Sequence, residues 1–153
     1  VSLDDALPIY RMKNICVFAG SGGGRLPEYA AAAAGLGRLL AESRITLVYG
    51  GGSTGLMGAV ADGALKAGGK VIGVIPTDLT GIELDELFEA LCWAQLGFHA
   101  KPCGLLNIKG YYDPLLKLVK NAVDEGFVKE ADAARLLVGA EPRELLAAIL
   151  AYK

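Results

Sequence analysis

Two glycine-rich turns, each directly after a short apolar run, are the residues of this sequence best suited to bind an anion. The first turn begins with Gly20 and Ser21 and continues to Gly24, and the second contains Gly51, Gly52, Ser53, Thr54 and Gly55. Without side chains in the way, backbone N–H groups approach a phosphate closely, and a helix that follows adds its positive end. One turn alone is equally well explained as a tight turn, but two turns favour a phosphate site with the hydroxyls as further donors.

A cluster of carboxylates, Asp85, Glu86 and Glu89, stands at the start of an expected helix farther along the chain. The dipole of a helix favours carboxylates at its amino end, and position alone favours this structural explanation. The catalytic interpretation is that Glu86 contacts the hydroxyls of a ribose or orients a water. Breaking a glycosidic bond passes through an oxocarbenium-like cation, which a nearby anion stabilises more than it stabilises the neutral sugar.

An alternation of short apolar runs and helical segments must position these residues. We expect strands at 15–19, 46–49, 71–75, 103–108 and 136–138, and helices at 27–43, 55–67, 84–96, 113–125 and 141–151. Unbroken apolar strands are buried on both faces of a sheet, and helices between them form right-handed crossovers. The sequence therefore predicts an α/β fold, a Rossmann-like doubly wound parallel sheet with helices on both faces, whose ligand lies at the carboxyl ends of the strands.

Length and composition are typical of a single globular domain. The 153 residues are 53% hydrophobic and 21% charged, with a net charge of −2 and 21 glycines that follow no collagen-like period. Neither a membrane span nor a leader pattern is expected, and a charge this evenly mixed does not favour a nucleic-acid partner. We expect residues 1–11 to be an N-terminal extension or an expression remnant, and residues 12–153 to form one nucleotide-binding catalytic domain in the cytoplasm.

Metal and redox chemistry are not indicated by the sequence. The chain has three cysteines, Cys16, Cys92 and Cys103, without a C-x-x-C pair, and one histidine, His99. A zinc site is nearly excluded, the cysteines are interpreted as reduced thiols of the core, and we predict neither a metal nor a cofactor. His99 is better explained by capping or packing than as a general base, since no Ser or Cys nucleophile pattern accompanies it.

Two better-known nucleotide motifs fit the sequence less well. Gly50-x-Gly52-x-x-Gly55 formally matches the dinucleotide fingerprint, with Asp78 beyond it, but it follows the second strand rather than the first. A Walker A loop is absent, because the pair Gly69-Lys70 leads into a strand. A dinucleotide-binding domain therefore stays open as a weaker alternative.

Longer motifs carry a resemblance to a known family. They are Val17-Phe18-Ala19-Gly20-Ser21, Tyr49-Gly50-Gly51-Gly52-Ser53-Thr54-Gly55-Leu56-Met57-Gly58, Val71-Ile72-Gly73-Val74-Ile75-Pro76, Asp85-Glu86-Leu87-Phe88-Glu89, Trp93-Ala94-Gln95-Leu96-Gly97 and Tyr111-Tyr112-Asp113. In this order they resemble the LOG family, the cytokinin riboside 5′-monophosphate phosphoribohydrolases that were formerly labelled lysine decarboxylases. The resemblance runs from Asn14 to the carboxyl terminus.

The resemblance implies hydrolysis of the N-glycosidic bond of a cytokinin riboside 5′-monophosphate, or of AMP, to the free base and D-ribose 5-phosphate. It also implies a metal-independent cytosolic homodimer, with further assembly in some members. Glu86 matches the catalytic glutamate that ends the family signature P-G-G-x-G-T-x-x-E, and Asp85 matches its acidic neighbour at the substrate. Gly20, Ser21 and the 51–55 turn match other nucleotide-facing turns. A carrier of a nucleotide or of the molybdenum cofactor, without turnover, is the alternative.

The chain departs from the family pattern before Asp85. Ile82 and Glu83 stand where the signature has Gly-Thr, and the Pro-Gly-Gly of the main phosphate loop is missing. The family also has a further central strand and a helix with an Arg-Lys pair, which supplies a catalytic arginine, and neither stands between Pro76 and Asp85. We favour residues missing from the sequence as printed over a variant that lost them, because a parallel sheet without a central strand exposes apolar faces of its neighbours.

Overall fold

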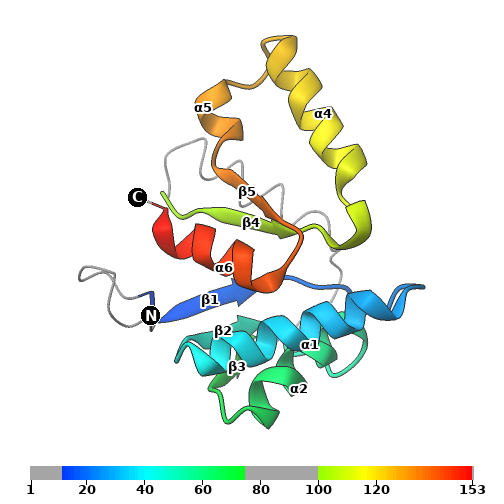
Figure 1. Ribbon diagram of the computed structural model, residues 1–153, viewed down its shortest axis with the longest axis vertical. Helices are drawn as coiled ribbons and strands as arrows, with labels where there is room; N and C mark the ends of the chain where they lie inside the picture. The colour runs from blue at the N-terminus through cyan, green and yellow to red at the C-terminus, as the bar shows by residue number, and fades with distance from the viewer. Residues whose placement is uncertain (1–11, 75–99, 153) are drawn as a thin grey trace.

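The structure, a computed structural model, describes residues 12–74 and 100–152 as a mixed α/β fold (Figure 1). Its first part consists of β1 (Asn14–Val17), α1 (Pro27–Glu42), β2 (Thr46–Tyr49), α2 (Gly55–Lys66) and β3 (Val71–Gly73). Its second part consists of β4 (Cys103–Leu106), the 3-10 helix η2 (Ile108–Gly110), α4 (Asp113–Asp124), α5 (Glu130–Ala133), β5 (Leu136–Gly139) and α6 (Pro142–Ala151). The five expected strands are present, η2 and α5 are additional, and the expected helix at 84–96 lies outside the described residues.

All described strand pairs are parallel, which confirms the predicted strand direction. Ile15 of β1 lies opposite Leu47 of β2, which in turn lies opposite Val71 of β3, and Leu105 of β4 lies opposite Val138 of β5. These strands form two sheets, β1-β2-β3 and β4-β5, rather than the single sheet that the sequence predicts. No strand among the described residues joins the two sheets, so the ladder of parallel hydrogen bonds is interrupted there.

Glycines let the two helices of the first part touch. A Cβ atom on Gly37 of α1 would collide with the backbone of Val60, and one on Gly63 of α2 would collide with the backbone of α1. At these two positions the helices leave no room for water between them. The core therefore lies between this helix pair and the first sheet, where Leu40, Leu47 and Val60 are fully buried.

Helix α6 covers the second sheet and joins it to the core of the first part. A Cβ atom on Gly104 of β4 would lie 3.1 Å from the Leu145 side chain, and one on Gly139 of β5 would lie 2.8 Å from it. On the same helix, Leu146 belongs to the cluster of buried residues that contains Leu40. The two sheets are thus held together on one side by helices rather than by strand pairing.

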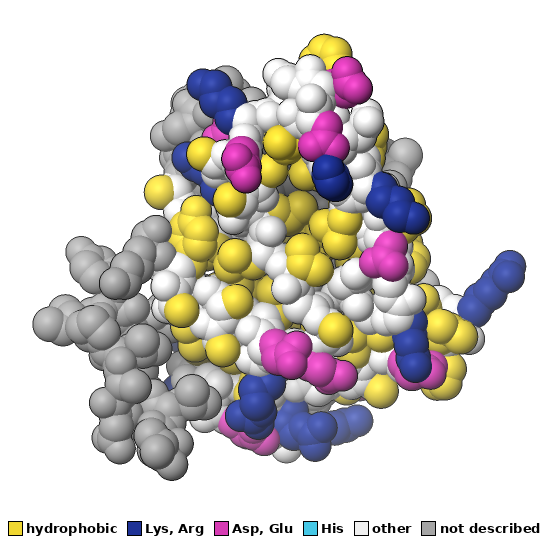
Figure 2. All heavy atoms as spheres, turned by 45° about the horizontal axis from the view of Figure 1, so that its top comes forward, with side chains coloured by type: hydrophobic (Ala, Val, Ile, Leu, Met, Phe, Trp, Pro, Cys, Tyr) yellow, Lys and Arg dark blue, Asp and Glu magenta, His cyan; other side chains and the backbone are white. Residues whose placement is uncertain are grey.

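Among the described elements, helix α4 has no neighbour that covers it in this way. Figure 1 shows it extending away from both sheets, and none of its residues is buried. Leu118 of α4 is 59% exposed and Phe127, which follows the helix, is 82% exposed. Figure 2 shows hydrophobic side chains gathered in the middle of one face of the molecule, with Lys, Arg, Asp and Glu side chains around them. The described residues therefore leave apolar surface of the second part uncovered.

Candidate functional site

The two predicted glycine turns lie against each other at the carboxyl ends of β1 and β2. The carbonyl oxygen of Gly20 accepts hydrogen bonds from the N–H groups of Leu56 (2.9 Å) and Met57 (3.2 Å) in the first turn of α2. Gly55 has a φ of 60°, and a Cβ atom there would collide with the backbone carbonyl of Ser21. Glycine is therefore required at this position both for its backbone conformation and for the close approach of the first turn.

The amino end of α2 is already occupied by the first turn. Besides the bonds to Gly20, the N–H of Leu56 lies 3.3 Å from the carbonyl oxygen of Gly22, and the N–H of Gly58 donates to Thr54 at 3.0 Å. A helix end attracts an anion through N–H groups that have no other partner. This helix end therefore offers an anion fewer N–H donors than the sequence predicts. A phosphate here would be bound by the turns and by hydroxyls at the surface, such as that of Thr54.

The carboxylates of the predicted site cannot be placed against these turns. Asp85 and Glu86 lie outside the described residues, and so do Asp78 and His99. The structure positions the phosphate side of the predicted site, which consists of Gly20, Ser21, Gly51, Gly52, Ser53, Thr54 and Gly55. The distance from this side to the catalytic carboxylate remains a prediction.

A third turn, the one after β4, packs onto α1 beside the first turn. The ring of Tyr111 makes edge-to-face contacts with the ring of Tyr29 (5.8 Å between centroids) and with that of Tyr112 (4.9 Å). The Asn107 amide donates to the Asp113 carboxylate at 2.9 Å, and its oxygen accepts a hydrogen bond from the N–H of Tyr112 at 2.7 Å. The hydrogen bonds of Asn107 fix the turn from which α4 starts. The contact between Tyr111 and Tyr29 places this turn of the second sheet next to the first part.

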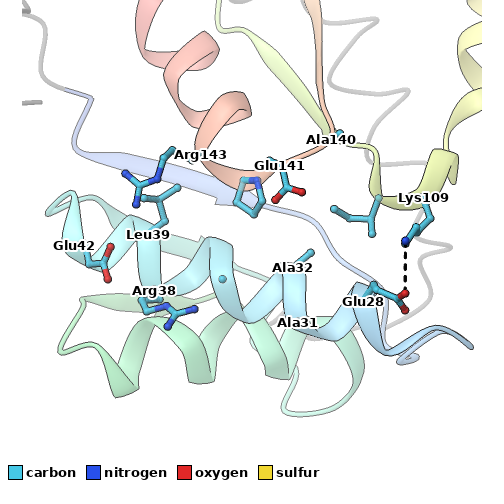
Figure 3. A pocket seen from close by; sticks show the side chains of 13 residues that line it. Glu28, Ala31, Ala32, Arg38, Leu39, Glu42, Lys109, Ala140, Glu141 and Arg143 are labelled. Atoms are coloured by element: carbon cyan, nitrogen blue, oxygen red, sulfur yellow. Dashed lines mark ion pairs between the residues drawn. The ribbon is translucent and has the colours of Figure 1, made fainter.

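A cavity of about 860 Å³ lies between α1, η2 and the turn from β5 to α6 (Figure 3). It is lined by Glu28, Ala31, Ala32, Gly35, Arg38, Leu39, Glu42, Ile108, Lys109, Ala140, Glu141, Pro142 and Arg143. Small side chains of α1 form one wall, and the charged groups come from three separate segments. The sequence does not indicate this site, because these segments meet only in the folded chain.

The cations and the carboxylates around this cavity are equal in number. The cations are Arg38, Lys109 and Arg143, and the carboxylates are Glu28, Glu42 and Glu141. Lys109 Nζ lies 3.8 Å from Glu28 Oε1, and within the described residues no other ion pair forms among these six side chains. A bare anion therefore meets no net attraction in this cavity.

Lys109 holds an unfavourable backbone conformation beside the cavity. Its φ is 54°, in the left-handed region, which costs a residue with a Cβ atom about 1–2 kcal/mol. The side chains of Lys109 and Glu28 are 59% and 46% exposed, and an exposed ion pair of this kind contributes at most about 1 kcal/mol. The ion pair alone does not offset the cost of the backbone conformation.

The two described cysteines differ in exposure. Cys103 begins β4 and is partly buried, and this burial raises the pKa of its thiol, so that the group stays protonated at neutral pH and is a poor nucleophile. Cys16 is exposed, so the interpretation of the cysteines as core thiols is wrong for this residue. The reason is that successive side chains of a strand point to opposite faces of the sheet: Ile15 and Val17 pack against the buried core, so Cys16 lies on the other face. Cys92 lies outside the described residues.

Two further kinds of site are not found in the part of the chain that the structure describes. No group of three or more His, Cys, Asp or Glu side chains lies close enough together there to hold a metal ion. None of the helices there combines the length and the apolar composition that crossing a membrane requires.

Parallel strands with glycine turns at their carboxyl ends define the protein as a Rossmann-like α/β protein. A family model described as "SLOG cluster4 family" matches residues 12–97, and one described as "Possible lysine decarboxylase" matches residues 80–149. Cytokinin riboside 5′-monophosphate phosphoribohydrolase LOG7 of Arabidopsis thaliana is 40% identical over 182 aligned positions, which cover 94% of this chain and 83% of that protein. The cytokinin riboside 5′-monophosphate phosphoribohydrolase of Rhodococcoides fascians is 37% identical, over 90% of this chain and 89% of that protein. The chain belongs to the LOG family, as its motifs predict.

Solved structures support the fold. The Moco carrier protein of Chlamydomonas reinhardtii aligns with a TM-score of 0.69 at 22% identity, over 94% of this chain and 99% of that one. This likeness confirms the predicted Rossmann-like architecture. The alignment with the Arabidopsis enzyme is longer than this chain, so that enzyme has residues to which nothing here corresponds. This fits the prediction that the chain lacks residues of the family pattern.

Proposed function

We propose that the protein hydrolyses the N-glycosidic bond of a cytokinin riboside 5′-monophosphate and releases the free base and D-ribose 5-phosphate. The observation that carries the proposal is the 40% identity to the Arabidopsis phosphoribohydrolase over 94% of the chain. AMP, which has the same ribose 5-phosphate group, is the proposed second substrate. The reaction needs neither a metal nor an organic cofactor.

The proposed roles of the residues follow from charge development in the reaction. Glu86 stabilises the oxocarbenium-like cation and positions the attacking water, and Asp85 approaches the substrate beside it. Gly20, Ser21 and the 51–55 turn hold the phosphate side of the nucleotide. The contact between the two turns at the carboxyl ends of β1 and β2 supports this assignment, since ligands of open α/β sheets bind at that edge.

We propose residues 12–153 as the catalytic domain, working in the cytoplasm as a homodimer or a larger homo-oligomer, without a nucleic-acid or membrane partner. The exposed apolar side chains of Leu118 and Phe127 support association, because surfaces of this kind are commonly covered by a second copy. Light scattering after size exclusion measures the mass of the particle. A monomer at all concentrations would contradict the oligomer.

The activity is tested by incubating the protein with isopentenyladenosine 5′-monophosphate or AMP and measuring the free base by chromatography. Glu86→Gln is expected to slow base release by about 100-fold or more, as for other groups that stabilise transition-state charge. Glu89→Gln removes the same charge three residues farther along and is expected to retain most of the activity. Equally slow release by the wild type and Glu86→Gln would exclude the enzymatic function.

A carrier that binds a nucleotide or the molybdenum cofactor without turnover is the second candidate. The specific observation in its favour is that Ile82 and Glu83 replace the Gly-Thr of the signature, with no Pro-Gly-Gly before them. A carrier would bind AMP or the cofactor and release no base. A dinucleotide-binding domain would instead gain thermal stability from NAD or NADP, since a ligand of the folded state raises the melting temperature.

A further inference from the structure

We propose that the cavity between α1 and the turn from β5 to α6 is a second ligand site, which binds a phosphate monoester on a hydroxyl-bearing body of sugar or nucleotide size. The proposed phosphate-binding groups are Arg38 and Arg143, which both line the cavity. The proposal does not rest on glycosidic activity, because none of the residues involved belongs to the catalytic or phosphate-binding candidates described above.

The cavity has the size and shape that such a ligand needs. Its volume of about 860 Å³ falls within the range of about 300–1,000 Å³ that is typical of small-molecule sites. It follows α1 from Glu28 to Glu42, a length of roughly 20 Å at 1.5 Å per helical residue. Ala31, Ala32 and Gly35 line it along this length, and their small side chains leave room for a sugar or a planar base.

The two arginines come from different helices, and within residues 12–74 and 100–152 neither is paired with a carboxylate. Arg38 belongs to α1 and Arg143 to the first turn of α6, and neither forms an ion pair with a described residue. Guanidinium groups bind phosphate oxygens through parallel hydrogen bonds. Figure 3 shows both arginines toward the Glu42 end of the cavity, whereas Lys109 and Glu28 lie at the opposite end. The phosphate is therefore expected at the Glu42 end.

Lys109 is an independent indication that the cavity has a function. Its left-handed backbone, with a φ of 54°, lies directly at the cavity and is not compensated by the exposed pair with Glu28. Backbone strain of this kind persists where the surrounding structure imposes it, and it is enriched at ligand-binding positions. The Lys109 ammonium can donate a hydrogen bond to a hydroxyl or a ring nitrogen at the far end of the ligand.

The carboxylates of the cavity decide which class of phosphate compound fits. Glu28, Glu42 and Glu141 balance the three cations, so inorganic phosphate gains little from the site as a whole. A ligand with a phosphate and also hydroxyl or amino donors satisfies the arginines and the carboxylates together. Nucleoside monophosphates and sugar phosphates share this chemistry.

Binding is tested by NMR titration of the whole chain with ribose 5-phosphate, AMP, adenosine and inorganic phosphate. We expect ribose 5-phosphate or AMP to shift the backbone amide of Gly35 and its neighbours in α1. Adenosine and inorganic phosphate are expected to bind at least about tenfold more weakly. Adenosine lacks the phosphate that the arginines bind, and inorganic phosphate lacks the hydroxyl-bearing body that the carboxylates bind. Stronger binding of AMP identifies a nucleotide ligand, and equal binding identifies a sugar phosphate; either result supports the proposal. No shift at Gly35 at millimolar concentrations, or equal binding of adenosine or inorganic phosphate, overturns it.

Two cavity variants and one charge control separate this site from non-specific binding. Arg38→Gln combined with Arg143→Gln is expected to weaken binding by about tenfold or more, whereas Arg44→Gln combined with Lys66→Gln removes equal charge outside the cavity and changes affinity by less than about twofold. Gly35→Leu fills the cavity, and because a Cβ atom at Gly35 meets no other atom within 4 Å, this variant is expected to fold and to lose binding.

Unchanged affinity in both cavity variants overturns the proposal. Base release by the same variants is measured in parallel and is expected to stay at the wild-type level. A protein without glycosidic activity can still show the binding described here, so failure of the proposed function and failure of this proposal are distinguished.

Discussion

The two parts of the molecule share parallel strands connected by helices, yet they are packed very differently. In the first part, α1 and α2 touch through Gly37 and Gly63 and completely bury Leu40, Leu47 and Val60. In the second part, the connection from β4 to β5 runs through α4, none of whose residues is buried. The same kind of connection thus gives a core in one part and an uncovered helix in the other.

The difference shows that a helix becomes part of a core only when another helix or strand lies at contact distance. The apolar pattern of the helix alone is not sufficient. Of the described helices, α4 has the most clearly separated apolar and polar sides, whereas α1 is a run of alanines, glycines and leucines with a weaker separation. Most helix stability in proteins comes from the burial of an apolar face against other elements. Helix α1 has these elements beside it, and among the described residues α4 has little beyond α5.

The largest expected effect on stability is a difference between the two parts when leucine is replaced by alanine in each. Leu40→Ala removes a side chain with no exposed surface and is expected to lower the free energy of unfolding by about 2–5 kcal/mol. Leu118→Ala removes the same atoms from α4, where the residue is 59% exposed, and in a single subunit it is expected to cost less than about 0.5 kcal/mol. Urea unfolding followed by circular dichroism measures both. Equal losses would show that α4 has a partner that the described residues do not include.

A smaller effect is expected from two glycines two positions apart in α1. Gly37→Ala places a Cβ atom against the backbone of Val60 and is expected to destabilise the protein by about 1–3 kcal/mol. Gly35→Ala, where the added atom meets nothing within 4 Å, is expected to stabilise it by up to about 1 kcal/mol through helix propensity. Thermal unfolding of both variants gives the signs. The same sign at both positions would mean that α1 and α2 are not in contact.

The contact between the two parts is expected to be weaker still. Tyr111→Leu removes the ring that meets Tyr29 across the parts, and aromatic pairs of this kind contribute about 0.5–1.5 kcal/mol beyond their buried area. A double-mutant cycle with Tyr29→Leu isolates this coupling energy. Phe127→Leu, at an 82% exposed position, is the control and is expected to be neutral. A coupling energy of zero would show that the turn after β4 does not contact the first part through these two rings.

The smallest expected effect is a difference in thiol reactivity. Burial raises the pKa of Cys103, so its alkylation at neutral pH is expected to be slower than that of the exposed Cys16 and to accelerate as pH rises. Because the folded pKa lies above the unfolded one, this thiol favours the folded state below the unfolded pKa, and that contribution is lost as pH rises through the folded pKa. Peptide mapping by mass spectrometry after iodoacetamide treatment measures both rates. Faster alkylation of Cys103 at pH 7 would show that β4 opens readily.

Much of the fold follows from local patterns. The apolar run at 103–108 and the glycine turn at 50–55 predict a buried parallel strand and a strand-to-helix turn, and both are present. The hydrogen bonds from Leu56 and Met57 to Gly20 were not predictable, because they join turns about 35 residues apart, and the spacing of residues along the chain carries no information on such a contact. For the same reason the exposure of Cys16 was wrongly expected, since it depends on which elements cover the face of the sheet on which this side chain lies.

The sequence by itself determined the element types, the parallel direction of the strands, the glycine turns and the membership in the LOG family. The first three features rest on residue type and periodicity, which act over a few neighbours along the chain, whereas the family membership rests on the resemblance of longer motifs. The tertiary structure decided that the first glycine turn occupies the amino end of α2 and that the strands form two sheets. It also decided the cavity that Arg38, Lys109 and Arg143 line together. Each of these depends on how segments far apart in the chain approach one another, which packing decides and local patterns do not.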